Sequence, residues 1–262
     1  MKILLISTGG TIASIKEENI HLDAPFKILD YILKDETHGI EFEYASPFTV
    51  LSENMNFELW QKLCAAINEN NINNIIILHG SDTLAFTSSL LGKLFSYKNI
   101  VVTASNKPCE DEDSNAVPNF LNALRQVKKG QKGVFVSYDG VYPAETIASA
   151  DGFDIFRAVG KSDGKSKSEF KPKNILIIKP YVNINYDNYN LNGVDAVLHE
   201  MYHSATVPDS SKTFAKKCRD MGIPFYFVTP KSSADYESAK DIKDMIIYNS
   251  TTENAYAILN CD

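Results

Sequence analysis

The chain has 262 residues, 44% of them hydrophobic, and a formal net charge of −7. This composition excludes a disordered chain, and the length allows one large or two smaller domains. The acidic balance argues against general nucleic-acid binding, which needs a basic surface to neutralise phosphates. No run approaches the ~18 apolar residues of a membrane span, and the N-terminus lacks the features of a signal peptide. We therefore predict a cytoplasmic protein with no nucleic-acid partner and no membrane partner.

Short apolar strands alternate with helical patterns through the first half of the chain. The helix predicted from residue 56 places Phe57, Trp60, Leu63 and Cys64 on one stripe, with Asn56 as its N-cap. The strand predicted at 75–78 is continuously apolar, as in a parallel sheet buried on both faces. The pattern predicts strands at 3–7, 40–45, 75–78, 100–103 and 133–137 and helices at 56–70, 83–95 and 117–128.

Residues 160–168 are rich in Gly, Ser and Lys, which predicts a mobile linker. We expect a large domain at 1–159, a linker at 160–173 and a small domain at 174–262. The small domain is expected to have strands at 175–178, 196–198, 225–228 and 245–248, a helix at 210–221 and a last helix. The predicted fold class is α/β: a doubly wound, mostly parallel sheet with a second, smaller α/β domain.

Cysteine and histidine usage gives no sign of a metal. The four cysteines, Cys64, Cys109, Cys218 and Cys261, lie far apart and lack metal-site spacing, so reduced thiols are expected. His199 and His203 are four residues apart, but their context is the end of a strand and not a helix. We predict no metal site.

Two loops offer hydroxyl groups at strand ends. Thr8-Gly9-Gly10-Thr11-Ile12-Ala13 directly follows the first strand, and His79-Gly80-Ser81-Asp82-Thr83 follows another in the same layout. Paired glycines allow a sharp turn and a close approach to a ligand. Open α/β sheets bind ligands at the carboxyl ends of their strands, so the two loops are expected to share one site.

Acyl transfer needs a nucleophile and donors for an oxyanion. Thr11 is a candidate nucleophile, the backbone N–H groups of Thr11 and Ser81 are candidate donors, and Asp82 could hold a substrate ammonium. Alternatively, the hydroxyls of the first loop only satisfy a turn and cap a helix. A phosphate loop is a third interpretation, although Gly-x-Gly-x-x-Gly and Gly-Lys-Ser/Thr are both absent.

The two loops together resemble the signature motifs of the bacterial-type L-asparaginases, the asparaginase/glutaminase family, which usually has Thr where Ser81 stands. The resemblance extends over nearly the whole chain. Further matching segments are 51–55 (Leu-Ser-Glu-Asn-Met), 102–105 (Val-Thr-Ala-Ser), 120–124 (Phe-Leu-Asn-Ala-Leu), 150–156 (Ala-Asp-Gly-Phe-Asp-Ile-Phe), 207–208 (Val-Pro) and 222–224 (Gly-Ile-Pro).

The resemblance implies hydrolysis of the side-chain amide of asparagine, or of a related amide, without a cofactor. Thr11 would attack the amide carbon, and Ser81 would replace the second catalytic threonine. Ser52 would bind the α-carboxylate, and Asp82 with Glu53 the α-ammonium. Backbone positions expected around the substrate are Gly10, Gly80 and Ala104. Active members are generally homodimers or homotetramers, in which a partner's small domain completes the site.

Two departures from the family change the expected charge of the site. Ile147 stands where the family carries a lysine that pairs with the acid matched by Asp82. Glu53 replaces a residue that tends to be Gln or Ser, although a solvent-facing Glu53 is an alternative. If both acids face the pocket, it should favour an ammonium and reject additional anions. The loop at 14–23 also lacks the tyrosine found in many members.

Three interpretations remain open at this stage. The chain is a working amidohydrolase that takes a lysine from elsewhere, such as Lys161 or Lys165. Alternatively it is a slow enzyme or one with an altered substrate, because an oxyanion hole alone is worth ~10²–10³ in rate. The third interpretation is a catalytically impaired homologue that acts as an amino-acid-binding protein.

Overall fold

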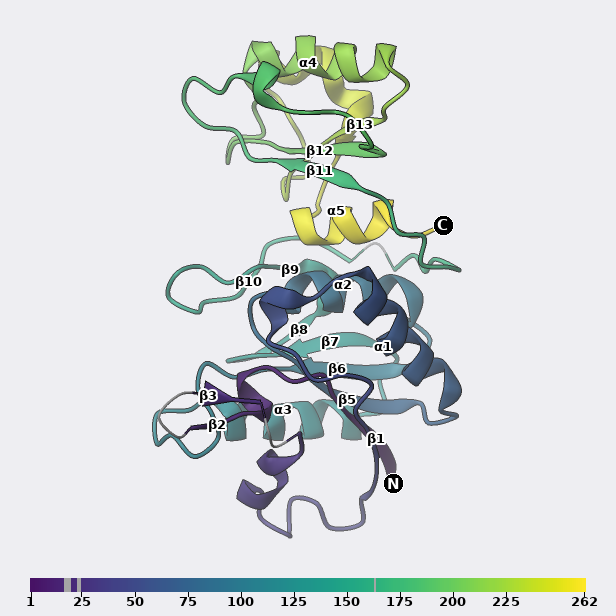
Figure 1. The fold of residues 1–262 in the computed structure, drawn as a ribbon, viewed down its shortest axis with the longest axis vertical. Helices are drawn as coiled ribbons and strands as arrows, with labels where there is room; N and C mark the ends of the chain where they lie inside the picture. The colour runs from purple at the N-terminus through teal and green to yellow at the C-terminus, as the bar shows by residue number, and fades with distance from the viewer. Residues whose placement is uncertain (17–19, 23–24, 163) are drawn as a thin grey trace.

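Two β-sheets lie one above the other along the long axis of the molecule (Figure 1). The computed structural model describes residues 1–16, 20–22, 25–162 and 164–262. The first sheet is built from the N-terminal half of the chain, and the second from residues beyond 174. Each sheet has helices on both faces, and this is the α/β architecture that the alternating pattern predicts.

The first sheet has six strands in the order β4-β1-β5-β6-β7-β8. Its first five strands are parallel, and β8 pairs antiparallel with β7. The central strands β5 and β6 are almost entirely buried, as their continuous apolar runs predict. The strands are β1 (Lys2–Ser7), β4 (Glu41–Ala45), β5 (Asn74–Leu78), β6 (Asn99–Thr103), β7 (Gly133–Ser137) and β8 (Val141–Pro143).

Helices cover both faces of this sheet. On one face, α1 (Phe57–Glu69) and α2 (Leu84–Leu94) pack against alternate side chains of the strands, including Ile75 and Ile77. On the other face, α3 (Ala116–Lys128) packs against the intervening side chains, such as Ile76. Asn56 caps α1 by accepting a hydrogen bond from the backbone N–H of Leu59 at 3.0 Å, as predicted.

The second sheet has four parallel strands in sequence order. Helix α4 (Asp209–Asp220) lies on one face and α5 (Thr252–Leu259) on the other. The strands are β11 (Ile175–Ile178), β12 (Ala196–Glu200), β13 (Phe225–Val228) and β14 (Ile246–Ile247). β11 forms an edge of this sheet, so one side of its backbone has no neighbouring strand.

Helix α5 joins the two sheets, and Figure 1 shows it between them. Its Ala255 belongs to the core cluster of the second sheet with Leu198. Two residues on, Ala257 belongs to a cluster with Trp60 of α1 and Leu90 of α2. The small side chains of the helix thus allow close packing on both faces at once.

The described residues of the segment predicted as a linker form several hydrogen bonds with other parts of the chain. The backbone N–H of Lys161 donates to the carbonyl of Asn249 at 2.7 Å, and that of Lys167 to the carbonyl of Lys93 at 2.8 Å. The Ser162 hydroxyl donates to Glu145 at 3.0 Å. The segment therefore touches α2 of the first sheet as well as residues that follow β14.

The structure also contains short elements that the sequence pattern does not predict. They are β2 (Ile15–Lys16) with β3 (Ile20–His21), β8, and the hairpin of β9 (Ile147–Ala148) with β10 (Arg157–Ala158). Two- and three-residue strands are too short to show a period of two, so pattern reasoning has nothing to detect. The longer predicted elements agree with the structure to within one or two residues at most ends.

Candidate functional site

The two hydroxyl-bearing loops begin at the carboxyl ends of adjacent strands. Ser7 at the end of β1 pairs with Leu78 at the end of β5. The Thr8 backbone N–H and hydroxyl both donate to the carbonyl of Leu78, at 3.0 and 2.9 Å. Thr8 is buried, so its hydroxyl serves this turn and is not available to a ligand.

The loops touch each other through two glycines. A β-carbon at Gly10 would clash with the Cα and the backbone nitrogen of Gly80, and Gly10 has a φ of +74°. Only glycine fits both the contact and this backbone conformation. Thr11 and Ser81 each follow one of the touching glycines. The backbones of the two residues therefore begin close to each other.

A third segment closes around the second loop. It is the 3₁₀ turn Ser52–Asn54, whose first residue is buried. The Ser52 hydroxyl donates to the Asp82 carboxylate at 3.2 Å and accepts from the Asp82 backbone N–H at 3.1 Å. The Thr83 hydroxyl donates to the Ser52 carbonyl at 2.9 Å. The predicted residues Gly10, Gly80, Ser52 and Asp82 are therefore brought together.

The side chains expected to react are open to solvent. Thr11 and Ser81 are partly exposed, and the Asp82 and Glu53 residues are exposed. Neither acid takes part in an ion pair between residues that the structure describes. The site thus presents two hydroxyls, two carboxylates and the backbone N–H groups of two strand-end turns. This set can support acyl transfer to a hydroxyl nucleophile.

His79 is a buried neutral histidine beneath these loops. Its Nδ1 lies 2.7 Å from the Gly80 carbonyl, which can only accept, so we assign the ring proton to Nδ1. Burial lowers the pKa of His79 to about 4. Within the described structure its Nε2 has no hydrogen-bond partner. His79 is the first residue of the second loop motif, but the sequence alone predicts no role for it.

Ala104 lies one residue beyond the end of β6, the strand that neighbours β5. Its carbonyl accepts from the side-chain amide of Asn119 at 2.9 Å, and Asn119 also accepts from the Asp139 backbone N–H at 2.9 Å. Asn119 is fully buried and ties together the ends of β6 and β7. A single asparagine on an amphipathic helix carries no sequence signal for this function.

Ile147, which the sequence comparison expects in the lysine position, is fully buried. It belongs to the apolar cluster that contains Ala144, Tyr138 and Phe156. The surroundings of this side chain are therefore apolar. The expectation about the loop at 14–23 falls partly on residues outside the described ranges.

A buried ion pair lies two residues before Ile147. Lys93 of α2 contacts Glu145 at 3.1 Å, and both side chains are almost fully buried. The Ser162 hydroxyl donates to the same carboxylate oxygen. Sequence reasoning missed this pair because its members are separated by 52 positions and belong to no motif.

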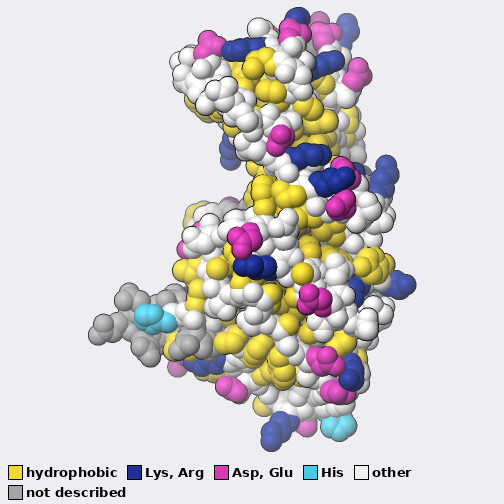
Figure 2. Space-filling view, turned by 45° about the vertical axis from the view of Figure 1, so that its right-hand side comes forward, with side chains coloured by type: hydrophobic (Ala, Val, Ile, Leu, Met, Phe, Trp, Pro, Cys, Tyr) yellow, Lys and Arg dark blue, Asp and Glu magenta, His cyan; other side chains and the backbone are white. Residues whose placement is uncertain are grey.

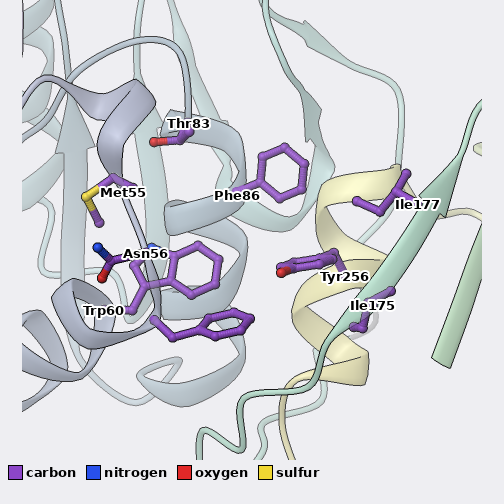
Figure 3. A pocket seen from close by; sticks show the side chains of 9 residues that line it. Met55, Asn56, Trp60, Thr83, Phe86, Ile175, Ile177 and Tyr256 are labelled. Carbon is purple, nitrogen blue, oxygen red and sulfur yellow. The ribbon is translucent and has the colours of Figure 1, made fainter. Parts of the chain in front are cut away.

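An apolar groove of 450 Å³ adjoins the site (Figure 3). Two of its lining residues lie next to site segments in the chain: Thr83 follows Asp82, and Met55 follows Asn54. Phe86 and Tyr256 pack edge to face in its lining, with ring centroids 5.5 Å apart. The complete lining is Met55, Asn56, Phe57, Trp60, Thr83, Phe86, Ile175, Ile177 and Tyr256. Figure 2 shows hydrophobic side chains where the molecule narrows between its upper and lower parts.

Two negative findings hold for the residues that the structure describes. None of the helices among them is long and apolar enough to cross a membrane. In the same residues, no three His, Cys, Asp or Glu side chains are placed to hold a metal ion.

The family model for the N-terminal asparaginase domain matches residues 2–173. The chain belongs to the asparaginase family. It is 34% identical over 146 residues to an L-asparaginase of Thermococcus kodakarensis, covering 53% of this chain and 44% of that protein. It is 29% identical over 143 residues to a subunit of the glutamyl-tRNA(Gln) amidotransferase of Methanosphaera stadtmanae, covering 52% of this chain and 33% of that relative. These matches span less than half the length of either relative.

Solved structures match over almost the entire chain and show the same fold. The thermostable L-asparaginase of Thermococcus kodakarensis superposes with a TM-score of 0.77 at 22% identity, covering 99% of this chain and 92% of that one. L-asparaginase I of Vibrio cholerae gives 0.77 at 23% identity with the same coverage. The α/β fold with a second parallel sheet is thus that of the asparaginases.

Proposed function

We propose that the chain hydrolyses the side-chain amide of asparagine, or of a related amide, to the acid and ammonia. The observation that carries the proposal is the contact between Gly10 and Gly80. It brings the two hydroxyl-bearing loops of an asparaginase-family chain to one point at the edge of the sheet. A turn-capping role alone requires no such contact.

In this proposal Thr11 is the nucleophile. Its oxygen attacks the amide carbon, ammonia leaves, and water then cleaves the acyl-enzyme. Ser81 assists as the second hydroxyl. Backbone N–H groups of the two loops stabilise the oxyanion, and the absence of side chains at Gly10 and Gly80 lets them approach it. No cofactor takes part.

Substrate binding falls to the residues around these hydroxyls. Asp82 and Glu53 hold the ammonium group, while Ser52 fixes Asp82 by the two hydrogen bonds at 3.2 and 3.1 Å. Ala104 supplies a backbone wall. We further propose a cytoplasmic homodimer or homotetramer, with a catalytic domain at 1–159, a linker at 160–173 and a small domain at 174–262.

A second candidate function is binding of an amino acid without efficient turnover. It is favoured by Ile147, because no cation pairs with Asp82 among the described residues. The two functions share a ligand and differ in whether the ligand is consumed.

The deciding experiment measures ammonia release from L-asparagine and L-glutamine by the wild-type chain and by Thr11→Ala. Glutamine is included because amidotransferase subunits are among the relatives. We expect release that falls by at least ~10³-fold in Thr11→Ala, the scale seen when a nucleophile is removed. Thr8→Ser, at a hydroxyl committed to the Leu78 carbonyl, is the matched control. Release unaffected by Thr11→Ala would contradict the proposal. A thermal shift with no release would favour the binding protein.

A further inference from the structure

Two exposed acids lie close to the hydroxyl-bearing loops in the fold. Asp82 follows Ser81 and is hydrogen-bonded to Ser52, and Glu53 follows Ser52 in the same turn. No ion pair joins either acid to a cation among the residues described. The position that could carry a compensating lysine holds the buried Ile147. A ligand entering this site meets two negative charges, so the site attracts an ammonium and repels a carboxylate.

The hydroxyl of Ser52 is not free to offset that repulsion. Its only proton is donated to the Asp82 carboxylate, and it accepts from the Asp82 N–H. The Thr83 hydroxyl in turn donates its proton to the Ser52 carbonyl. Each of these two hydroxyls has thus committed its single donor to the protein. A substrate carboxylate at this wall would find oxygen acceptors in place of donors.

The groove continues the site on its apolar side. Thr83 links the two, because it lines the groove and its hydroxyl donates to the Ser52 carbonyl. Met55, which also lines the groove, follows the turn that contains Ser52 and Glu53. Most of the remaining lining is aromatic or aliphatic, including Phe86 and Ile177 in Figure 3. An amide substrate that extends beyond the two carboxylates can place an uncharged, apolar group there, whereas a free asparagine ends in an anion.

We propose that the substrate is the N-terminal asparagine of a peptide, with an apolar side chain in second position. This inference rests on the proposed amidohydrolase function. The peptide's ammonium lies between Glu53 and Asp82, its first carbonyl is an uncharged amide, and its second side chain enters the groove. In the reaction the C–N bond of the asparagine amide breaks and a C–O bond forms with water. The products are an N-terminal aspartate and ammonia, with no oxidant or reductant.

The first experiment compares asparagine derivatives with and without the α-carboxylate and the α-ammonium. Ammonia release is measured with L-asparagine, L-asparaginamide and asparaginyl-leucinamide, and with N-acetyl-asparaginamide as the control that lacks the ammonium. We expect kcat/KM for both cationic amides to exceed that for L-asparagine by at least ~10-fold, and the acetylated control to be poor. The margin should shrink in Glu53→Gln and at high salt. L-asparagine as the best of the four would overturn the proposal.

The second experiment uses Trp60, the one tryptophan in the chain, which lines the groove. In Thr11→Ala, asparaginyl-leucinamide should change the emission of Trp60, and asparaginyl-glycinamide should bind at least ~5-fold more weakly. Ile177→Gln should remove this difference, whereas Val182→Gln, at an exposed loop position, should keep it. Equal binding of the two peptides would show that the second side chain does not enter the groove. Emission that depends on protein concentration alone would assign the groove to contact with a second copy of the chain.

The two proposals fail in distinguishable ways. If the cationic amides bind to the Thr11→Ala variant but no amide is consumed by the wild-type chain, the charge preference stands and the proposed hydrolysis fails. If L-asparagine is consumed best, the hydrolysis stands and the peptide preference fails.

Discussion

The two sides of the candidate site differ in how far they follow the asparaginase pattern. On the hydroxyl side, Gly10 and Gly80 touch, and Thr11 and Ser81 follow them. On the charged side, Ile147 is a buried hydrocarbon where the sequence comparison expects a lysine, and Glu53 is an exposed acid. The close contact of the two loops is therefore present, whereas the charges differ from those expected of the family.

This difference separates two physical requirements of the site: close contact between two backbones, and the charge of the side chains. The close contact of two backbones permits only glycine, so few substitutions are compatible with it. A charge position is less constrained, because an apolar side chain can fill the same space when the neighbouring cluster is apolar. Ile147 with Ala144 and Phe156 is such a case. We therefore expect the hydroxyl side to determine the reaction and the charged side to determine the substrate.

The largest expected effect comes from breaking the hydroxyl side with Gly10→Ala. The new β-carbon must displace the loop of Gly80, and a ~1 Å displacement of a catalytic group costs ~10²-fold in rate. Unfolding should become easier by about 2–4 kcal/mol, since backbone strain alone costs ~1–3 kcal/mol. Ammonia release and urea unfolding measure the two effects.

Gly39→Ala is the matched control for that variant. Gly39 has the same φ of +74° as Gly10 but nothing within 4 Å of its Cβ position. It should therefore show the strain alone, with activity unchanged. Equal effects of the two variants would mean that the contact with Gly80 does not position the nucleophile.

The charged side is tested by Ile147→Lys. If the missing cation limits turnover of L-asparagine, the variant should raise that turnover by about tenfold or more, toward the ~10²–10⁴ that acid–base assistance contributes. It should also lower the free energy of unfolding, because an ammonium replaces a fully buried hydrocarbon. Ile147→Met has a similar volume and adds no charge. It should therefore change neither the turnover nor, to a large extent, the free energy of unfolding. Unchanged kcat in Ile147→Lys would show that another group supplies the base.

The last prediction concerns the pH dependence of stability, and it compares the two sheets. Burial lowers the pKa of His79, below the loops, and of His199, in β12, to about 4 each, from an ordinary value of 6.5. His199 Nδ1 lies 2.6 Å from the Glu200 carbonyl, so we assign its ring proton there, and Nε2 then accepts from the Tyr186 hydroxyl at 2.8 Å. Between these two pKa values the unfolded chain binds more protons than the folded one. The free energy of unfolding should therefore fall as pH drops from about 6.5 to about 4, by up to ~1.4 kcal/mol per pH unit for each histidine.

Denaturant titrations at several pH values measure this slope. His199→Asn should flatten it without changing the activity at neutral pH, since His199 lies in the second sheet. His79→Asn should flatten it and lower the activity as well. A slope that survives both substitutions would assign the acid sensitivity to other groups.

Much of the fold was predictable because its elements are long and periodic. Apolar runs such as 75–78 and the stripe that includes Trp60 and Leu63 are local signals, and the structure confirms them. Hairpins of two-residue strands and the Lys93–Glu145 pair depend on contacts between distant positions, so no window of sequence contains them.

The candidate site shows the same division. The loops around Gly10 and Gly80 were predictable because glycine just beyond an apolar strand is a local signal with a backbone cause. The groove, the fixing of Ser52 by Thr83 and the neutral state of His79 were not, because each depends on the burial of several segments together. The roles of Thr11, Ser81 and Glu53 stay predictions.

The most direct measurement is the mass of the intact protein quenched during turnover of an asparagine amide, followed by peptide mapping. The account predicts a covalent acyl adduct on Thr11 that disappears as the substrate is consumed, and no adduct in Thr11→Ala. Ammonia release with an adduct on another residue, or with Thr11→Ala as active as the wild-type chain, would contradict it.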